Sequence, residues 1–206
     1  PYLSRGLGDV YKRQEQAAAI EVWRGPASAV LGGNTLHGAI NVITPIPDQS
    51  LIALEAGPDE FGRVAWQGGT DLGGHKIGAA FVGANFGGYR DDSGYGQQKL
   101  SLSQLADVSG WAVRSHLTAT LLNQETGGYV RGEEAYKDAD LRTSNPNPEA
   151  YRDAWPLRVN SEFSRDAWTI KPYARRSQMQ FLQHFLPGQP LEENEQSSLG
   201  VIIDHA

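Results

Sequence analysis

Residues 21–44, EVWRGPASAVLGGNTLHGAINVIT, contain two short strand patterns that are separated by turn and helix signals. Ile20–Trp23 mixes apolar β-formers with a charged residue, as a short half-buried strand does. Ala39–Thr44 carries the β-branched residues of a second strand, and Pro45 closes it. The block therefore predicts a strand, an interruption and a second strand in one compact unit.

Glycine and proline residues between the two strand patterns predict where the backbone turns. Gly25 is a suitable cap before Pro26, whose fixed φ suits the first position of a helix. Ala27–Leu31 is long enough for about one helical turn, which Gly32 can end because glycine accepts a left-handed φ at low cost. These residues alone are also compatible with an ordinary strand–turn–strand unit. A phosphate-binding loop is not supported, because neither GxGxxG nor a Lys-Ser/Thr pair follows Gly25.

The order of residues in this block closely resembles the C-terminal part of the plug domain of TonB-dependent outer-membrane receptors. In that family a pattern of the form IEV.RGP.SALYG...GG.IN.IT leads from the plug into the barrel. The matching positions are Ile20, Glu21, Val22, Arg24, Gly25, Pro26, Ser28, Ala29, Leu31, Gly32, Gly38, Ile40, Asn41, Ile43 and Thr44. The sequence departs from the pattern at Val30, where an aromatic residue is usual, and at His37, which replaces the first glycine of a pair.

The sequence divides into three expected segments. Residues 1–14 read PYLSRGLGDVYKRQ, lack the pattern of a signal peptide and end in residues that look like a translated sequencing adapter. We expect a non-native segment there, with a genuine polar linker as the alternative. Residues 15–46 are expected to be the C-terminal part of a plug domain, and residues 47–206 the N-terminal strands of an incomplete barrel.

Strand patterns alternate with turn signals throughout the rest of the chain. The expected strands are 50–56, 61–70, 76–86, 98–106, 111–121, 157–163, 168–181 and 199–203. The period of two is clearest where Trp111 and Leu117 share one face of a strand and Arg114 and His116 share the other.

Short and long connections alternate between these strands. Short turns are expected at 71–74, 107–110 and 164–166, and long connections at 87–96, 125–155 and 184–196. Bacterial outer-membrane barrels have short periplasmic turns and longer extracellular loops. We therefore predict a mainly β fold, in which about eight antiparallel strands of a larger transmembrane barrel follow the C-terminal piece of an α/β plug. A soluble β-sandwich is the alternative, because strand alternation alone fits both folds.

Length and composition narrow the function classes. A plugged outer-membrane transporter has about 22 strands, which needs far more chain than 206 residues. The net charge of -6 without a basic cluster argues against a nucleic-acid partner. The chain has no cysteine, and it has no run of about 18 apolar residues that would predict a membrane-spanning helix.

No constellation of residues predicts catalysis, a metal or a cofactor. The histidines are scattered without ligand spacing, and the paired carboxylates fall in expected loops. Ser115 and His116 lack the context of a nucleophile elbow. We therefore predict that the protein is not an enzyme and has no cofactor.

Aromatic and basic side chains indicate two candidate contact surfaces. Trp111 and Trp168 lie beside short turns on the apolar side of their strands, where a membrane girdle would place them. The long connection at 125–155 offers rigid aromatic and guanidinium groups that suit a ligand site, with a solvated lid as the alternative. Its candidate ligand residues are Tyr129, Arg131, Tyr136, Arg142, Tyr151, Arg152 and Trp155.

The family resemblance implies a receptor that takes up a scarce nutrient, such as a ferric siderophore, across the outer membrane of a Gram-negative bacterium. The implied partners are outer-membrane lipid, a small-molecule nutrient and a TonB-type energising protein, which would bind an N-terminal region outside this sequence. The segment in hand is not expected to transport by itself. A soluble β-rich binding or adhesion module is the alternative function.

The resemblance also implies roles for residues of the block. Glu21 and Arg24 match a charged pair that tends to bridge to the barrel wall, and such a pair could act as a plug latch because breaking a buried ion pair is costly. The alternative is that the two side chains satisfy each other. The plug turn would be formed by Gly25, Pro26, Gly32 and Gly38.

Overall fold

The structure is a computed structural model that describes residues 19–25 and 37–205. The chain divides into two compact units, residues 1–46 and residues 47–206, and each unit is described by itself.

Several sequence expectations fall outside the described residues. They concern the non-native segment at 1–14, Pro26, the helical turn at 27–31 and Gly32. These expectations stay predictions.

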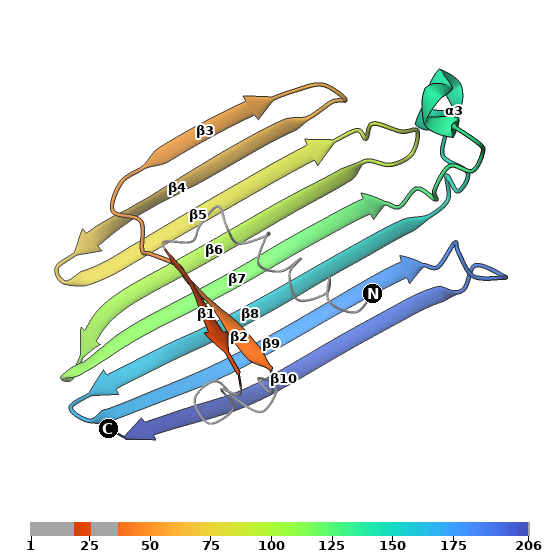
Figure 1. The fold of residues 1–206 in the computed structure, drawn as a ribbon. Coiled ribbons are helices and arrows are strands. Elements are labelled where there is room, and N and C mark those ends of the chain that lie inside the picture. The colour runs from red at the N-terminus through yellow and green to blue at the C-terminus, as the bar shows by residue number, and fades with distance from the viewer. Residues whose placement is uncertain (1–18, 26–36, 206) are drawn as a thin grey trace. The chain divides into compact units, whose positions relative to one another are not determined.

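Strands dominate the described part of the chain (Figure 1). They are β1 (Ala19–Arg24), β2 (Gly38–Ile43), β3 (Leu51–Ala56), β4 (Gly62–Leu72), β5 (His75–Phe86), β6 (Tyr95–Val108), β7 (Trp111–Glu125), β8 (Tyr151–Arg165), β9 (Trp168–Leu182) and β10 (Leu191–His205). Two short helices, η2 (Ala135–Lys137) and α3 (Ala139–Thr143), lie between β7 and β8.

The first unit contains a two-stranded antiparallel sheet of β1 and β2, at the positions where the block predicts strands. Glycine is required at Gly38, because a Cβ there would lie 2.6 Å from the carbonyl oxygen of Trp23 and φ is +147°. Gly25 has a φ of +92°, which is the left-handed conformation expected of a turn glycine. The two strands can therefore approach each other closely only with glycine at the start of β2.

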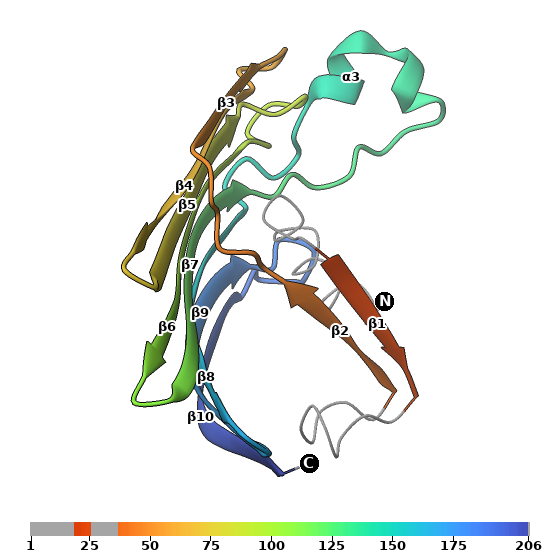
Figure 2. The same cartoon turned by 90° about the vertical axis from the view of Figure 1, so that its left-hand side faces the viewer.

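The second unit is one antiparallel sheet of eight strands in chain order, β3 to β10. Figure 2 shows that this sheet is curved. It is not closed, because β3 and β10 are its two edges among the described residues. The predicted fold class, a partial antiparallel barrel, is confirmed. A β-sandwich packs two sheets face to face, and this arrangement of eight strands in a single sheet does not match it.

Two-residue turns join the strands at one end of the sheet. Gly73 and Gly74 link β4 to β5 with φ values of +65° and +92°. Ser109 and Gly110 link β6 to β7 with φ values of +55° and +79°. Positive φ at both central residues defines the type I′ turn, whose twist matches that of the flanking strands.

Longer connections join the strands at the other end. They are the β5–β6 connection at 87–94, the β7–β8 connection at 126–150 and the β9–β10 connection at 183–190. The expected loop at 125–155 was wrong at its end, because Tyr151–Trp155 belong to β8 and Tyr151 pairs with Glu125. The expected connection at 184–196 was likewise too long, because Leu191–Gln196 pair with β9.

The larger sheet has one apolar face and one polar face, because directly paired residues point to the same side and successive residues to opposite sides. The apolar face carries Leu54, Val64, Phe81, Leu100, Leu117, Val159, Ile170 and Ile203. The polar face carries Arg63, Lys99, His116, Arg158, Lys171 and Arg175. The strands are therefore amphipathic across the whole width of the sheet.

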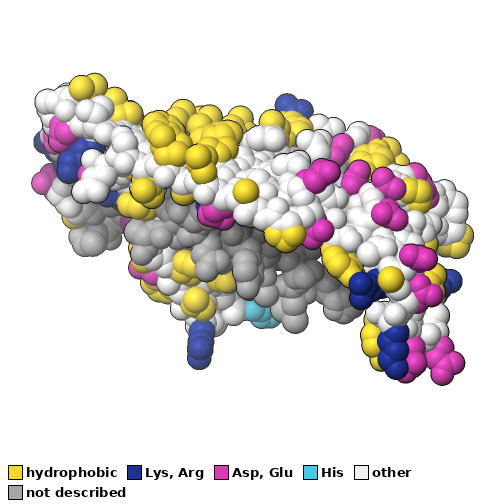
Figure 3. Space-filling view, turned by 90° about the horizontal axis from the view of Figure 1, so that it is seen from above, with side chains coloured by type: hydrophobic (Ala, Val, Ile, Leu, Met, Phe, Trp, Pro, Cys, Tyr) yellow, Lys and Arg dark blue, Asp and Glu magenta, His cyan; other side chains and the backbone are white. Residues whose placement is uncertain are grey.

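Large side chains on the apolar face are exposed. Leu54 is 76% exposed and Leu199 is 84% exposed, and no side chain among the described residues is large and fully buried. Figure 3 shows hydrophobic side chains gathered over part of the surface, with acidic side chains concentrated toward one end. An exposed apolar surface of this extent indicates contact with another apolar phase or partner.

Within the described ranges, neither helix has the length and apolar character that crossing a membrane requires.

Candidate ligand-binding site

Hydrogen bonds tie the three longer connections to one another. Arg90 of the β5–β6 connection donates from Nε to the carbonyl oxygen of Ser144 at 2.9 Å. Gln189 of the β9–β10 connection donates from Nε2 to Oε1 of Glu149 at 2.8 Å. The backbone hydrogen bond at Glu149, and then the Gln189 amide, lower the pKa of that carboxyl below its ordinary value. The β7–β8 connection is therefore held from both sides.

A pocket of about 470 Å³ opens between the β7–β8 and β9–β10 connections. It is lined by Gly128, Tyr129, Val130, Arg131, Leu141, Ser144, Pro146, Asn147, His184 and Phe185. The guanidinium carbon of Arg131 lies 5.6 Å from the centre of the Tyr129 ring, which is the geometry of a cation–π contact. Basic and aromatic side chains thus share one wall of the pocket.

Two other predicted ligand residues of this connection lie outside that lining. Tyr136 belongs to η2, is 70% exposed and has Nζ of Lys137 at 5.7 Å from its ring centre. Arg142 lies in the last turn of α3, which Asp138 caps by accepting hydrogen bonds from the amides of Asp140 and Leu141. The pocket brings together Tyr129 and Arg131, but not Tyr136 and Arg142.

The remaining predicted ligand residues are strand residues and not loop residues. Tyr151, Arg152 and Trp155 all belong to β8. Arg152 points to the polar face and donates from Nη2 to Oε1 of Gln124. Trp155 points to the apolar face with Leu157, so it faces away from the polar side of the sheet.

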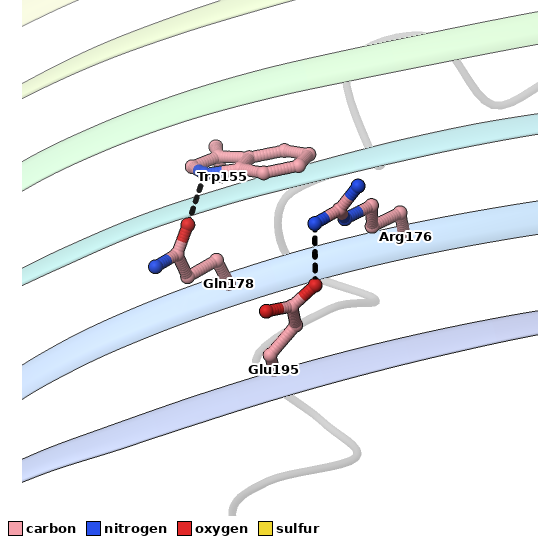
Figure 4. A network of polar contacts seen from close by, with 4 residues as sticks. All are labelled: Trp155, Arg176, Gln178 and Glu195. Carbon is pink, nitrogen blue, oxygen red and sulfur yellow. Dashed lines mark hydrogen bonds and ion pairs between the residues drawn. The ribbon is translucent and has the colours of Figure 1, made fainter.

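Trp155 lies at the border of the apolar face nearest the longer connections. Figure 4 shows its neighbours on that border: Trp155 donates from Nε1 to Oε1 of Gln178 at 3.2 Å, and Arg176 forms an ion pair with Glu195. Between this polar group and the short turns, the same face of β8 carries Leu157, Val159 and Phe163, with Ser161 between the last two. A tryptophan with an apolar ring and a bonded N–H suits the boundary between a membrane interior and water.

Trp111 and Trp168, the predicted girdle residues, begin β7 and β9 beside short turns. Trp168 pairs with Arg165, and its ring lies edge-on to His205 with 4.5 Å between the ring centres. From residue 155 to residue 165 the strand rises about 33 Å, which a tilt of about 40° reduces to about 25 Å along the membrane normal. This matches the apolar band of outer-membrane barrels, which is about 25 Å tall.

His184 and Phe185 line the pocket but were not predicted as ligand residues from the sequence. Their ring centres lie 5.6 Å apart, and Nδ1 of His184 is buried without a hydrogen-bond partner. The sequence offered only a weak signal, since the two residues lie in a different connection from Tyr129 and Arg131. Only the pairing of β8 with β9 brings the two connections together.

Ion pairs and hydrogen bonds cross the polar face. Nζ of Lys171 lies 3.7 Å from Oε2 of Glu162 and 3.6 Å from Oδ2 of Asp204. Nδ1 of His116 lies 2.8 Å from Oγ of Ser103. The described residues contain no group of three or more His, Asp or Glu side chains placed to hold a metal ion.

The predicted latch residues, Glu21 and Arg24, both lie on β1. They are an odd number of positions apart, so a strand directs them to opposite faces. Glu21 is paired with Asn41 and Arg24 with Gly38 in the ladder to β2.

No protein-family model and no curated protein sequence matches the chain. Solved structures do match. The siderophore receptor PiuA from Acinetobacter baumannii matches with a TM-score of 0.61 and 15% identity, over 80% of this chain and 26% of the receptor. The ferripyoverdine receptor of the outer membrane of Pseudomonas aeruginosa matches with a TM-score of 0.61 and 14% identity, over 89% of this chain and 29% of the receptor.

The ferric-catecholate import receptor Fiu from E. coli matches with a TM-score of 0.58 and 15% identity. The chain has the fold of a TonB-dependent receptor barrel. The match to Fiu covers 87% of this chain and 31% of Fiu, so the chain spans less than a third of that receptor. These structural neighbours are transport receptors and not enzymes.

In a receptor barrel the apolar face points to lipid and the polar face to the interior. In this sheet Arg158 and Lys171 lie on the polar face, whereas Val159 and Trp155 lie on the apolar face. The pocket lies at the end of the sheet that carries the longer connections.

Proposed function

We propose that the chain is part of an outer-membrane receptor for the energy-coupled uptake of a scarce nutrient such as a ferric siderophore. The observation that carries the proposal is the likeness of the chain's fold to siderophore receptors, including PiuA and Fiu. The amphipathic faces and the loop pocket support it, because a receptor needs a lipid-facing wall and a ligand site outside the membrane. The location is the outer membrane of a Gram-negative bacterium.

The partners of this receptor are outer-membrane lipid, a small-molecule nutrient and a TonB-type energising protein. Residues 15–46 are the C-terminal part of its plug domain, and residues 47–206 contribute the first strands of its barrel. The nutrient binds at the pocket lined by Tyr129, Arg131 and His184. Trp111, Trp155 and Trp168 lie at the two borders of the membrane.

Glu21 and Arg24 form the plug latch of this proposal. Because β1 directs the two side chains to opposite faces, the latch contacts of Glu21 and Arg24 would be made on different sides of β1. Gly25, Pro26, Gly32 and Gly38 shape the turn between the two strands of the plug segment, and the close approach at Gly38 explains one of these glycines.

The complete receptor is expected to restore the growth of a receptor-deficient Gram-negative strain under iron limitation. Growth should depend on the energising protein, because the proposed uptake draws its energy from the inner membrane. The measurement is uptake of iron-55 supplied as ferric siderophore complexes, in cells with and without a functional energising protein. Equal uptake by both cell types, or none above the vector control with any complex, would contradict the proposed function.

Arg131→Ala in the complete receptor is expected to weaken ligand binding at least tenfold, because the loss of a charge-assisted hydrogen bond costs about 1.5–3 kcal/mol. Arg142→Ala is expected to have the smaller effect, since Arg142 lies on α3 outside the pocket lining. The measurement is quenching of intrinsic fluorescence in a titration with the transported ferric complex. Equal affinities of both variants and the parent receptor would contradict a role for this pocket.

A further inference from the structure

An arginine lies at the border of the apolar face nearest the short turns. β8 ends, β9 begins and β10 ends at this end of the sheet (Figure 1). Arg165 pairs with Trp168, and Trp168 pairs with His205, so the three residues form one row across these strands. Trp168 comes two positions before Ile170, which is on the apolar face, so the whole row belongs to that face.

Trp111 of β7 extends this row on the other side of Arg165. The ladder between β7 and β8 ends with Ala112 opposite Ser164, and Trp111 and Arg165 are each one position beyond that pair. The two residues therefore point to the same face. The row places an indole-bearing residue on each side of the arginine.

The border differs at the other two-residue turns. The β4–β5 hairpin closes with Leu72 opposite His75, and the β6–β7 hairpin closes with Val108 opposite Trp111. Leu72 and Val108 are exposed apolar side chains. A girdle of aromatic residues does not itself need a guanidinium, so Arg165 distinguishes the β8–β9 border from the rest of the row of short turns.

The guanidinium of Arg165 has donors for a further acceptor. Its Nε lies 3.7 Å from Oδ2 of Asp166, whose side chain is 87% exposed. An ion pair this open to water contributes little, and it engages one of the five N–H donors of the guanidinium. Asp204 of β10 interacts instead with Lys171 on the polar face.

Trp168 offers an apolar ring and a polar N–H at the same border. It is exposed, and its ring meets His205 edge-on. An indole of this kind suits the layer between acyl chains and headgroups, and a long arginine side chain can lay its stem on apolar surface while its charge stays in the headgroup layer. A ligand that matches both groups carries a phosphate next to hydrocarbon chains.

We propose that the row of Trp111, Arg165, Trp168 and His205 binds the headgroup of an anionic phospholipid in the leaflet on the side of the short turns. Arg165 donates to the phosphate oxygens, and the two indoles contact the glycerol and the first acyl carbons. A zwitterionic headgroup carries an ammonium beside its phosphate, which offsets the attraction to the guanidinium. The inference rests on the proposed outer-membrane receptor function and adds a specific lipid site to it.

Two lipids with the same acyl chains and different headgroups test this site. They are dioleoylphosphatidylglycerol, which is anionic, and dioleoylphosphatidylcholine, which is zwitterionic. The complete receptor is expected to bind its first phosphatidylglycerol about fivefold or more tightly than phosphatidylcholine. Native mass spectrometry of the purified receptor, titrated with each lipid in detergent, gives the two affinities. Equimolar inorganic phosphate is expected to leave the bound lipid in place, because free phosphate lacks the chains that the indoles contact.

Two arginines of the same face supply the matched variants. Arg165→Gln is expected to lower the affinity for phosphatidylglycerol about fivefold and to leave that for phosphatidylcholine unchanged. Arg165→Lys should keep most of the preference, because it keeps the charge. Arg176→Gln is the control, since Arg176 lies at the opposite border of this face and pairs with Glu195. Heat-modifiable migration in gels confirms that each variant is folded.

The outcomes separate this inference from the proposed function. Three results would overturn the lipid site and leave the uptake function standing: equal binding of the two lipids, equal effects of Arg165→Gln and Arg176→Gln, or displacement of the lipid by equimolar phosphate. A headgroup preference that depends on Arg165, in a receptor without energy-dependent uptake of iron-55, would support the lipid site and contradict the uptake function.

Discussion

Val159→Arg is expected to destabilise the folded barrel of the complete receptor by about 2–4 kcal/mol, the cost of an arginine on the lipid face near the bilayer midplane. Val159 is 41% exposed on the apolar face, between Leu157 and Phe163 on β8. It lies about midway between Trp155 and Arg165, which mark the two borders of the apolar band on this strand. A guanidinium placed there would be transferred from water into hydrocarbon without a partner.

Asn160→Arg is the matched control for this prediction. Asn160 is the next residue of β8 and points to the polar face, where it pairs with Tyr173. An arginine at this position stays in the aqueous interior, so the expected change is within about 0.5 kcal/mol. The free energy of unfolding is measured by denaturant titration of the receptor in lipid vesicles. An equal effect of the two substitutions would contradict a lipid-facing role for this side of the sheet.

The sequence predicted the strands best where their two faces differ most. On β7, apolar Trp111 and Leu117 alternate with Arg114 and His116, and the predicted strand begins at the residue where β7 begins. The sequence also predicted the turns at Gly73 and Gly110, because a positive φ in a two-residue turn favours glycine.

The sequence failed at the strand ends near the longer connections. Leu191–Gln196 reads as a loop because it carries polar residues on both sides, yet it pairs with β9 in full register. In a barrel the strands extend beyond the membrane into water, where neither face needs apolar side chains. Tyr151–Trp155 was assigned to a loop for the same reason, and this error made Trp155 a ligand candidate when the register directs it to the apolar face.

The pocket could be predicted only in part. Tyr129 and Arg131 were recognisable because rigid aromatic and guanidinium groups in a long connection suit a ligand site. His184 and Phe185 were not, because their proximity depends on the pairing of β8 with β9 and not on any local pattern.

Gly69→Ala is expected to destabilise the receptor by about 1–3 kcal/mol, because it inserts a methyl group where the backbone leaves no room. A Cβ at Gly69 would lie 1.9 Å from the carbonyl oxygen of Pro47 and 2.8 Å from that of Ile77. Both contacts are backbone atoms, so no side-chain rotation can relieve them. The residue that must move is Pro47, in the segment that precedes β3, because Ile77 is fixed in the ladder between β4 and β5.

Gly62→Ala on the same strand separates this steric effect from the general cost of changing a strand glycine. A Cβ at Gly62 meets no atom within 4 Å, and replacing a strand glycine by alanine restricts the unfolded chain, so Gly62→Ala should be neutral or slightly stabilising. Limited proteolysis and denaturant titration of both variants are the measurements. Because the clash displaces Pro47, the Gly69 variant should gain a cleavage site before Leu51, the first residue of β3, in addition to losing stability. Equal stabilities and equal cleavage patterns would mean that the segment before β3 does not pack on Gly69 in the receptor, and the start of the barrel would then need a different path from the one seen here.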